Sequence, residues 1–491
     1  MNFTGIQPLL AEFLQRGMAI SPWLMINSQA RFDVDLYTQI DRLATYMLDK
    51  HWTEHEKIEI FGVFPLFERV PKTALYEIIA STALSLAHQK FGDLEIYEEQ
   101  ILAAFELLND FIKDRGIGNV VKLYSLVTSY ENEQALHYYG RIPEKIFNLG
   151  SWHRPWVDYS LSDELFWGIS EGCYQIEIVD QQRYVSLTDQ GVDFYFTNMQ
   201  ILEDCGYLIH RVRQMQIQNF SFYTNYAEVA NEFWPNLTQI RREFLEWSGI
   251  RPEMAVLELG CADGVSTFES GLAELVGAKG RVTAIDPSMG MIYRAKKRKA
   301  RRPAEWVEFE QASAEELPYA DQSFDAVIAF NSLHFMNIPR ALADIKRVLR
   351  SGGFFASLHP LQFNMAAHPL VAEWFSPIFA LAGHRKDGRL KDYLKSAEEI
   401  THEFLSAELI NISEKNDRVI IYFKDPEMAT HHLLCGIGWG QEELSMIPWQ
   451  AREEVIQKVI DQGRKLCDEY LPEERKIKTP VQMIKGYNAA R

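Results

Sequence analysis

Short apolar runs and amphipathic segments alternate through residues 254–360 of this chain. Runs rich in Val, Leu, Ile, Phe and Ala are typical of buried strands, and apolar residues that recur every three or four positions are typical of helices. The runs that predict strands are MAVLEL (254–259), RVTAID (281–286), WVEFEQA (306–312), DAVIAF (325–330) and FFASLHP (354–360). Helices are predicted between them, at 289–302 and 339–349 among others, and such alternation favours a doubly wound α/β sheet.

The N-terminal part of the chain has a different pattern. From Asp33 to about Arg115 the apolar residues recur at helical spacing, which predicts a helical domain over residues 1–115. In residues 116–200, short helical runs precede two strand-like runs around Asp180, and this order resembles a winged-helix domain. Residues 201–250 are expected to form connecting helices and a lid, followed by a third domain over residues 251–491.

The first predicted strand of that domain ends in a loop of small residues. Gly260, Ala262 and Gly264 let a ligand approach the backbone, and the helix that follows offers free N–H groups. Asp286 ends the next strand, 22 residues after Gly264, at the distance where an acid reaches ribose hydroxyls. The loop therefore predicts a ligand that carries a ribose.

The charges of the loop indicate which ribose-containing compound it binds. Glu258 and Asp263 bring negative charge, and Val265 stands where a dinucleotide-binding loop would have its third glycine. An acidic loop repels phosphate and suits a cation. S-adenosylmethionine, a nucleoside with a sulfonium and an ammonium group and no phosphate, fits these requirements.

Residues 256–357 resemble the core of class I S-adenosylmethionine-dependent methyltransferases, of the group that includes the ubiquinone and menaquinone C-methyltransferases. The resemblance rests on VLELGCADG, VTAIDPSMGMI, FEQASAEELPYADQSFDAVIAFNSLHF and ALADIKRVLRSGGFFASLHP. It implies a Rossmann-like domain with a mixed seven-stranded sheet and helices on both faces, preceded here by a mainly α-helical region. The cofactor contacts that it implies are Glu258, Gly260, Ala262, Asp263, Gly264, Asp286, Pro287, Ser313, Ala314, Glu315 and Asn331.

The chain departs from the family pattern at the adenine contact. The family usually has an Asp before Ala314, and this chain has Ser313, so the Ser313 hydroxyl or the Ala314 backbone is expected to hold the adenine. The family also has an aromatic-rich helix over the cofactor. Tyr223 and Tyr226 are candidates for that lid, although aromatic residues at such spacing are more often part of a core.

The chemistry of methyl transfer needs alignment more than it needs a metal. If the acceptor is a hydroxyl or phenol, a base helps, and His334 and His359 follow strand ends where they could act. Either could instead be structural, and a carbon or neutral amine acceptor would need neither. An apolar segment with Trp374, Phe375 and Phe379, within a predicted substrate cap at about 361–412, favours a hydrophobic or aromatic small-molecule acceptor.

Composition bounds the partners. The net charge of −18 and the pI near 5.3 oppose binding to a phosphate backbone. The predicted helix at 162–171 has no Lys or Arg, so we expect the winged-helix-like domain to mediate a homodimer and not to bind DNA. Five dispersed cysteines predict a reduced, cytoplasmic protein, and no apolar run is long enough for a membrane span.

Two further motifs have a functional and a structural interpretation. Seven bases between Arg294 and Arg302 could form a nucleic-acid patch, but a solvated helix end is favoured. His51 and His55 stand one helical turn apart without a visible third ligand, so no metal site is predicted.

The sequence thus predicts an enzyme that methylates a small metabolite. The alternatives are a winged-helix regulator with a S-adenosylmethionine-binding module, and a methyltransferase that acts on RNA or protein. The absence of an Asn/Asp-Pro-Pro-Tyr/Phe run, replaced here by NSLHF, weighs against methylation of nucleic-acid bases.

Overall fold

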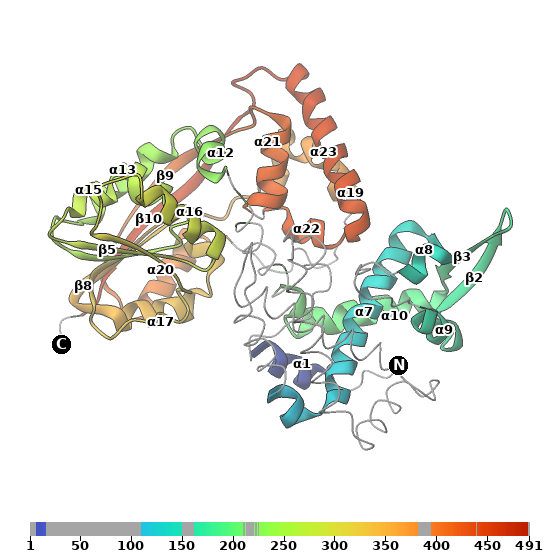
Figure 1. Ribbon diagram of the computed structural model, residues 1–491. Coiled ribbons are helices and arrows are strands. Elements are labelled where there is room, and N and C mark those ends of the chain that lie inside the picture. Colours follow the sequence, from blue (N-terminus) through green and yellow to red (C-terminus); the bar gives the residue numbers. More distant parts are fainter. Residues whose placement is uncertain are drawn as a thin grey trace. The chain divides into compact units, whose positions relative to one another are not determined.

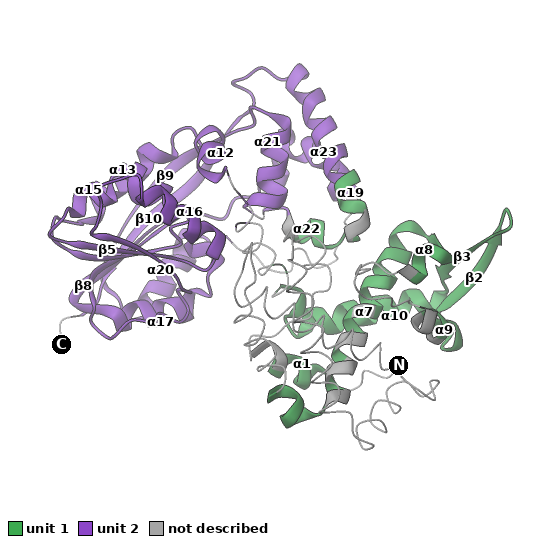
Figure 2. Cartoon of the chain, in the orientation of Figure 1, with its two compact units in different colours: residues 1–218, 381–390, 441–454 green, residues 219–380, 391–440, 455–491 purple. Residues whose placement is uncertain are grey.

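The computed structural model describes residues 6–15, 110–149, 162–209, 225–381, 394–437 and 439–489, and the single residues Val212, Phe220 and Tyr223 (Figure 1). The predictions for residues 33–109, including His51 and His55, lie outside these ranges. The chain forms two compact units: unit 1 consists of residues 1–218, 381–390 and 441–454, and unit 2 of residues 219–380, 391–440 and 455–491 (Figure 2).

Unit 2 is built on a seven-stranded mixed sheet with the order β6-β5-β4-β7-β8-β10-β9. The strands are β4 (Ala255–Leu259), β5 (Arg281–Asp286), β6 (Val307–Gln311), β7 (Phe324–Phe330), β8 (Leu349–Pro360), β9 (Ile410–Tyr422) and β10 (Lys476–Tyr487). The first five are parallel, and β10 runs antiparallel between β8 and β9. The Rossmann-like sheet expected from the sequence is therefore confirmed.

Helices cover both faces of this sheet, because alternate residues of each parallel strand point to opposite sides. The helices that pack on the Val256 side are α13 (Leu237–Ser248), α14 (Val265–Glu269), α15 (Leu272–Val276) and α16 (Met289–Lys299). The neighbouring residue Leu257 faces α17 (Ile338–Val348) and α20 (Ala397–Ser406). A capping box between Ser396 and Glu399 starts α20.

The remaining elements of unit 2 are helices, the last of which begins in unit 1 and continues into unit 2 after residue 454. They are α12 (Tyr226–Phe233), η1 (Leu333–Phe335), η2 (Met365–Ala367), α18 (Pro369–Trp374), α19 (Ser376–Leu381), α21 (Pro426–His431), the π-helical turn η3 (His432–Gly436) and α23 (Trp449–Glu469). Trp374 and Phe375 of the predicted substrate cap are fully buried, and Trp374 Nε1 donates to Thr430 Oγ1 at 3.1 Å. These two rings therefore pack in the core of unit 2, which is a structural role and not a contact with substrate.

Unit 1 contains a small three-stranded sheet among helices. Its elements are α1 (Ile6–Gln15), α7 (Ile117–Tyr139), β1 (Arg141–Pro143), α8 (Glu144–Leu149), α9 (Ser162–Ser170), β2 (Tyr174–Val179), β3 (Gln182–Leu187), α10 (Asp189–Asp204) and α22 (Gln441–Ser445). The two strands expected around Asp180 form the hairpin β2–β3, and both turn residues, Asp180 and Gln181, have positive φ, as a tight two-residue turn requires.

The units divide the chain differently from the boundaries that the sequence suggested at 200/201 and 250/251. Helices α12 and α13, expected to be connecting segments, belong to unit 2. The physical reason is burial, since Phe244 and other apolar residues of α13 belong to the core of the main sheet. Residues 441–454 leave unit 2 and join unit 1. Among the helices that the structure describes, none combines the length and hydrophobicity that a membrane crossing requires.

Candidate cofactor site

The loop after β4 has the backbone geometry that its small residues allow. Gly260, Ala262 and Gly264 all have positive φ, at 68°, 49° and 78°. A Cβ at Gly260 would collide with the side chain of Ser332, and one at Gly264 would lie 3.0 Å from Phe309 Cζ. These glycines therefore let the loop pack against β7 and β6, in addition to any approach by a ligand.

Asp286 ends β5 directly beside this loop. Its carboxylate accepts hydrogen bonds from the backbone N–H groups of Ala262, at 3.0 Å, and Ser288, at 2.9 Å. Burial raises the pKa of Asp286 to about 6, and the two backbone N–H groups oppose that shift. Pro287, next in the chain, is exposed, and its carbonyl accepts a hydrogen bond from Gln311 Nε2. The geometry thus brings Asp286 and the glycine loop together, as the sequence predicted.

Glu258 lies under the loop and is fully buried. Its two carboxylate oxygens accept hydrogen bonds of 2.6 Å from Ser266 Oγ and Thr267 Oγ1. Burial raises the pKa of Glu258, and the hydrogen bonds from these two hydroxyls offset part of that rise. Both oxygens of this acid therefore tie the end of β4 to α14.

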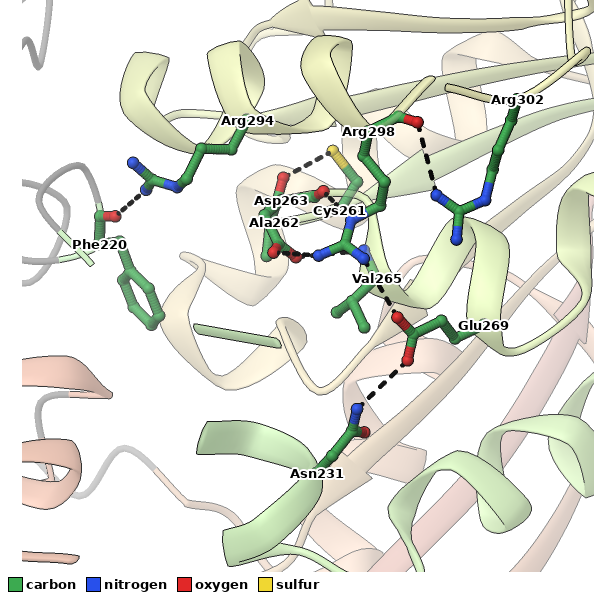
Figure 3. A network of polar contacts seen from close by, with 10 residues as sticks. All are labelled: Phe220, Asn231, Cys261, Ala262, Asp263, Val265, Glu269, Arg294, Arg298 and Arg302. Carbon is green, nitrogen blue, oxygen red and sulfur yellow. Dashed lines mark hydrogen bonds and ion pairs between the residues drawn. The ribbon is translucent and has the colours of Figure 1, made fainter. Parts of the chain in front are cut away.

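Asp263 is held by an arginine of α16 (Figure 3). Arg298 Nη2 lies 2.6 Å from Asp263 Oδ2, Arg298 Nε donates to the Asp263 carbonyl, and Arg298 Nη1 pairs with Glu269 at 3.1 Å. Asn231 of α12 donates to the same Glu269. The charge of Asp263 is thus balanced inside the protein, which leaves Asp286 as the acid beside the loop that is not paired with an arginine among the described residues.

This network corrects the view of the basic run as a purely solvated helix end. Arg294 and Arg298 are four residues apart, so they lie on one face of α16, and Arg302 follows just after the helix ends. Arg294 donates to the carbonyl of Phe220 at 2.7 Å, and Arg302 lies 4.7 Å from the Phe268 ring. Three of the seven bases are therefore used for internal contacts.

The segment after β6 forms a tight turn. Ser313 and Glu316 form an isolated β-bridge, and Ser313 Oγ accepts from the backbone N–H of Glu315 at 3.2 Å. Glu315 Oε1 accepts from the backbone N–H of Asn337, which fixes this turn to the start of α17. Ser313 is exposed and Ala314 is buried, so the Ser313 hydroxyl is the more accessible of the two.

Asn331 and His334 follow β7 with buried polar atoms that have no hydrogen-bond partner among the described residues. Asn331 has a φ of 53°, in the left-handed region, and its Oδ1 is such an atom. His334 Nδ1 is another, and burial lowers the pKa of His334 to about 3. Strained backbone and unsatisfied polar atoms at strand ends are typical of ligand sites.

His359 has a different environment. Its Nδ1 lies 3.1 Å from Ser357 Oγ, and its Nε2 lies 3.1 Å from Gln482 Oε1. Burial lowers the pKa of His359 to about 4. Because both ring nitrogens are engaged inside the sheet, this histidine is better placed to join β8 to β10 than to take a proton from a substrate.

The two predicted lid tyrosines lie near the loop, at the start of α12. Tyr226 is buried and packs with Val265, Met291 and the partly buried Ala262. The Tyr223 hydroxyl lies 2.6 Å from His432 Nδ1, in the π-helical turn η3. A π-helical turn is a frequent feature of functional sites.

Sequence reasoning missed Arg241. This residue occupies the apolar stripe of α13, in which it is 4% exposed. The signal in the sequence was a charged residue at a position that the helical spacing of the apolar residues places on the buried face of α13. The buried residues of that stripe are Leu237, Ile240, Arg241, Phe244, Leu245 and Ser248.

Comparison with known proteins agrees with this geometry. Residues 257–357 match the family model described as "Methyltransferase domain". A 2-phytyl-1,4-naphtoquinone methyltransferase from Synechocystis is 30% identical over 135 residues, which cover 26% of this chain and 53% of that protein. A ubiquinone/menaquinone biosynthesis C-methyltransferase from Hahella chejuensis is 33% identical over 135 residues, which cover 27% of this chain and 52% of that protein.

Among solved structures, the YcgJ protein from Bacillus aligns over 52% of this chain and 100% of its own, with 18% identity and a TM-score of 0.34. The sequence matches support a S-adenosylmethionine-dependent methyltransferase domain over residues 257–357. The chain spans about half the length of the curated relatives it matches.

The residues at the carboxyl edge of the sheet fit S-adenosylmethionine. Asp286 offers a carboxylate for ribose hydroxyls, and the unsatisfied Oδ1 of Asn331 offers an acceptor for an N–H or O–H group. The described residues contain no group of three or more His, Cys, Asp or Glu side chains arranged to hold a metal.

Proposed function

We propose that this protein transfers a methyl group from S-adenosylmethionine to a small, hydrophobic or aromatic acceptor. The observation that carries the proposal is the junction of a glycine loop, Asp286 and Asn331 at adjacent parallel strand ends, in the stretch that matches a methyltransferase domain. S-adenosylmethionine supplies an electrophilic methyl group on a sulfonium.

The residues of this chain orient the reactants. The Asp286 carboxylate accepts hydrogen bonds from the ribose hydroxyls, and the turn at Ser313–Glu315 contacts the adenine. The backbone of Gly260, Ala262 and Gly264 lies beside the amino-acid end of the cofactor. Glu258, Asp263 and Pro287 hold the loops in shape through their own contacts. Such positioning supplies most of the rate enhancement in an in-line displacement.

His334 is our proposed base for an acceptor that must lose a proton. The geometry carries this role: His334 follows the carboxyl end of β7, and its buried Nδ1 has no hydrogen-bond partner among the described residues, so this nitrogen is available to a substrate. Because quinone methyltransferases are among the relatives, the first acceptor to test is a ring carbon of a prenylated quinol. The hydroxyl group of the quinol itself activates that carbon.

The test combines product formation with binding. Full-length protein should convert labelled S-adenosylmethionine into S-adenosylhomocysteine in the presence of a prenylated naphthoquinol, or of a metabolite found by screening cell extracts for labelled products. His334→Gln should lose turnover and still bind S-adenosylmethionine by calorimetry. His431→Gln, at an exposed position of α21, provides a histidine control. Full activity of His334→Gln would leave His334 a packing residue.

For unit 1 we propose a winged-helix-like fold that mediates a homodimer in the cytoplasm. Support comes from the element order α7–β1–α8–α9–β2–β3, with β3 between β1 and β2 in one antiparallel sheet. The absence of Lys and Arg from α9, where a recognition helix would lie, disfavours the DNA-binding regulator. Sedimentation of the full chain should therefore give twice the mass of one chain.

A further inference from the structure

Tyr223 and His432 form a polar pair inside unit 2. The Tyr223 hydroxyl lies 2.6 Å from His432 Nδ1, and the His432 side chain is fully buried. His432 Nε2 is a buried atom that has no hydrogen-bond partner among the described residues. Burial lowers the pKa of His432 to about 3 and raises the pKa of Tyr223, so both side chains are neutral at pH 7.

The hydrogens of this tyrosine–histidine pair can be counted. A neutral imidazole has one N–H and a phenol has one O–H, and the contact between the two side chains uses one of these hydrogens. If Tyr223 donates to Nδ1, the hydrogen on Nε2 of His432 stays unused, and if Nδ1 donates to Tyr223, the phenol hydrogen stays unused. In both tautomers the pair keeps one donor without an acceptor in the part of the chain that the structure describes. Because an unpaired buried donor is costly, a ligand oxygen that accepts this hydrogen would stabilise the pair.

The turn η3 is shaped to hold the tyrosine ring. A Cβ at Gly436, the last residue of η3, would lie 2.5 Å from Tyr223 Cε1, so glycine is needed for this close packing. On the other side, the ring centroids of Phe233 and Trp234 lie 4.7 and 4.8 Å from that of His432. Tyr223 itself is only partly buried, so a ligand can reach the pair from the tyrosine side.

Aromatic rings connect this pair to the strand end that holds the proposed base. The ring centroids of Tyr223 and Tyr226 are 5.7 Å apart, and Phe220 lies 6.1 Å from Tyr226. Phe220 lies in turn 5.9 Å from Phe335, whose ring is 4.0 Å from that of His334. A row of rings therefore runs from the end of β7 to the tyrosine–histidine pair, and such a row suits an aromatic ligand.

We infer that the tyrosine–histidine pair binds an oxygen atom on the aromatic ring of the methyl acceptor. The inference rests on the proposed function, because it describes the acceptor end of the same site. The row of rings favours an aromatic acceptor, and the unused hydrogen selects those aromatic compounds that carry a phenol, quinol or quinone oxygen. Tyr223 and His432 are thus specificity-determining residues, whereas His334 remains the proposed base.

Two compounds that differ by one oxygen, 1-naphthol and naphthalene, test this assignment. Equilibrium dialysis of each labelled compound against the full chain, saturated with S-adenosylhomocysteine, measures their affinities. Naphthalene is the more hydrophobic compound, so a preference of the wild type for 1-naphthol requires a polar contact. We expect that preference, and its measurement requires no variant.

The double variant Tyr223→Phe, His432→Phe removes both hydrogens of the pair and keeps two rings. A double change is needed because either residue alone could still donate. This variant should bind 1-naphthol about fivefold more weakly than the wild type, as expected for one lost hydrogen bond, and should bind naphthalene within about twofold of the wild type. Its affinity for S-adenosylmethionine, measured by calorimetry, should be unchanged.

A matched control changes the same two residue types at exposed positions. Tyr293 of α16 is 53% exposed, and His431 is the exposed neighbour of His432. The double variant Tyr293→Phe, His431→Phe should bind both compounds as the wild type does. Thermal unfolding of each variant shows whether it is folded.

The possible results separate this inference from the proposed function. Equal wild-type affinities, or a preference for naphthalene, would overturn the inference. An equal loss for both compounds in the variant of the pair would make the pair a packing feature, and weaker binding of S-adenosylmethionine would assign it to the cofactor. Either result would also overturn the inference.

If the wild type binds S-adenosylmethionine but neither aromatic compound, the cofactor part of the proposed function stands. The aromatic acceptor and this inference then fail together. If the wild type does not bind S-adenosylmethionine, the proposed function itself fails, and the inference that depends on it fails too.

Discussion

Asp286 shows how one side chain links loop structure to ligand binding. Its carboxylate holds the glycine loop through the backbone N–H of Ala262 and remains beside the region where a ribose would lie. The sequence predicted this neighbourhood from spacing alone, because a strand end and the next loop along a parallel sheet meet at one edge. Spacing could not show that Asp263 and Glu258 are engaged by Arg298 and by hydroxyls, since those contacts depend on side-chain packing.

Affinity for S-adenosylmethionine should rise with pH through the pKa of Asp286, which is about 6. Only the ionised carboxylate can accept two ribose hydroxyls, so binding at pH 5 should be about tenfold weaker than at pH 7.5. Calorimetry across this range measures the effect. Asp286→Asn should bind weakly with a flat pH profile, and Glu308→Gln, an exposed site on β6, should behave as wild type. A flat wild-type profile would contradict the role of Asp286.

The ionisation of Asp286 also affects stability, and it changes stability with pH in the direction opposite to the change in affinity for S-adenosylmethionine. The pKa of Asp286 in the folded state lies above its ordinary value of 3.8, so the folded state holds the proton more tightly than the unfolded chain. The contribution of Asp286 to the free energy of unfolding of the ligand-free protein should therefore fall as pH rises from about 4 to about 6. Urea denaturation of wild type and Asp286→Asn at both pH values isolates this contribution.

Gly260→Ala should destabilise the protein more than Gly352→Ala, although both glycines have positive φ. A Cβ at Gly260 meets Ser332, whereas one at Gly352, with a φ of 77°, has no heavy atom within 4 Å. Backbone strain alone predicts a loss of about 1–2 kcal/mol for Gly352→Ala, and steric overlap raises the loss for Gly260→Ala to about 2–4 kcal/mol. Equal losses in urea denaturation would show that the contact with Ser332 is unimportant.

At the scale of elements, the predicted strands were recovered because most of their apolar residues are buried in the sheet. The run at 281–286 coincides with β5. The strand predicted to begin at Phe354 starts earlier: β8 begins at Leu349, and a register shift between its pairs with Phe324 and Ala326 accommodates the extra residues, which include Ser351-Gly352-Gly353. A local Ser-Gly-Gly signal is outweighed by pairing to neighbouring strands, which a single sequence does not reveal.

Helix α16 gives a prediction at this scale. Arg298→Met leaves Asp263, whose side chain is 5% exposed, without its cation, so the free energy of unfolding should fall by about 2–4 kcal/mol. Affinity for S-adenosylmethionine should fall too, because the loop loses its anchor. Lys296→Met, at an exposed position of the same helix, should change stability by less than about 0.5 kcal/mol in urea denaturation. Similar losses for both variants would refute the anchoring role.

At the scale of the whole molecule, charge separates the proposed enzyme from the regulator. The net charge is −18, and α9 has no Lys or Arg. Full-length protein at about 10 µM should therefore give no retarded band with duplex DNA at physiological salt, since non-specific binding depends on phosphate neutralisation. A retarded band that weakens steeply with added salt would support the regulator.

The path of the chain between its units also bears on how such a protein can be altered. Residues 441–454 belong to unit 1 although they lie within the part of the sequence that builds unit 2. No single cut in the gene separates the two units. Recombination that moved the whole of unit 2 into another protein would carry this segment of unit 1 along, so we expect the two units to have been inherited together and not exchanged separately.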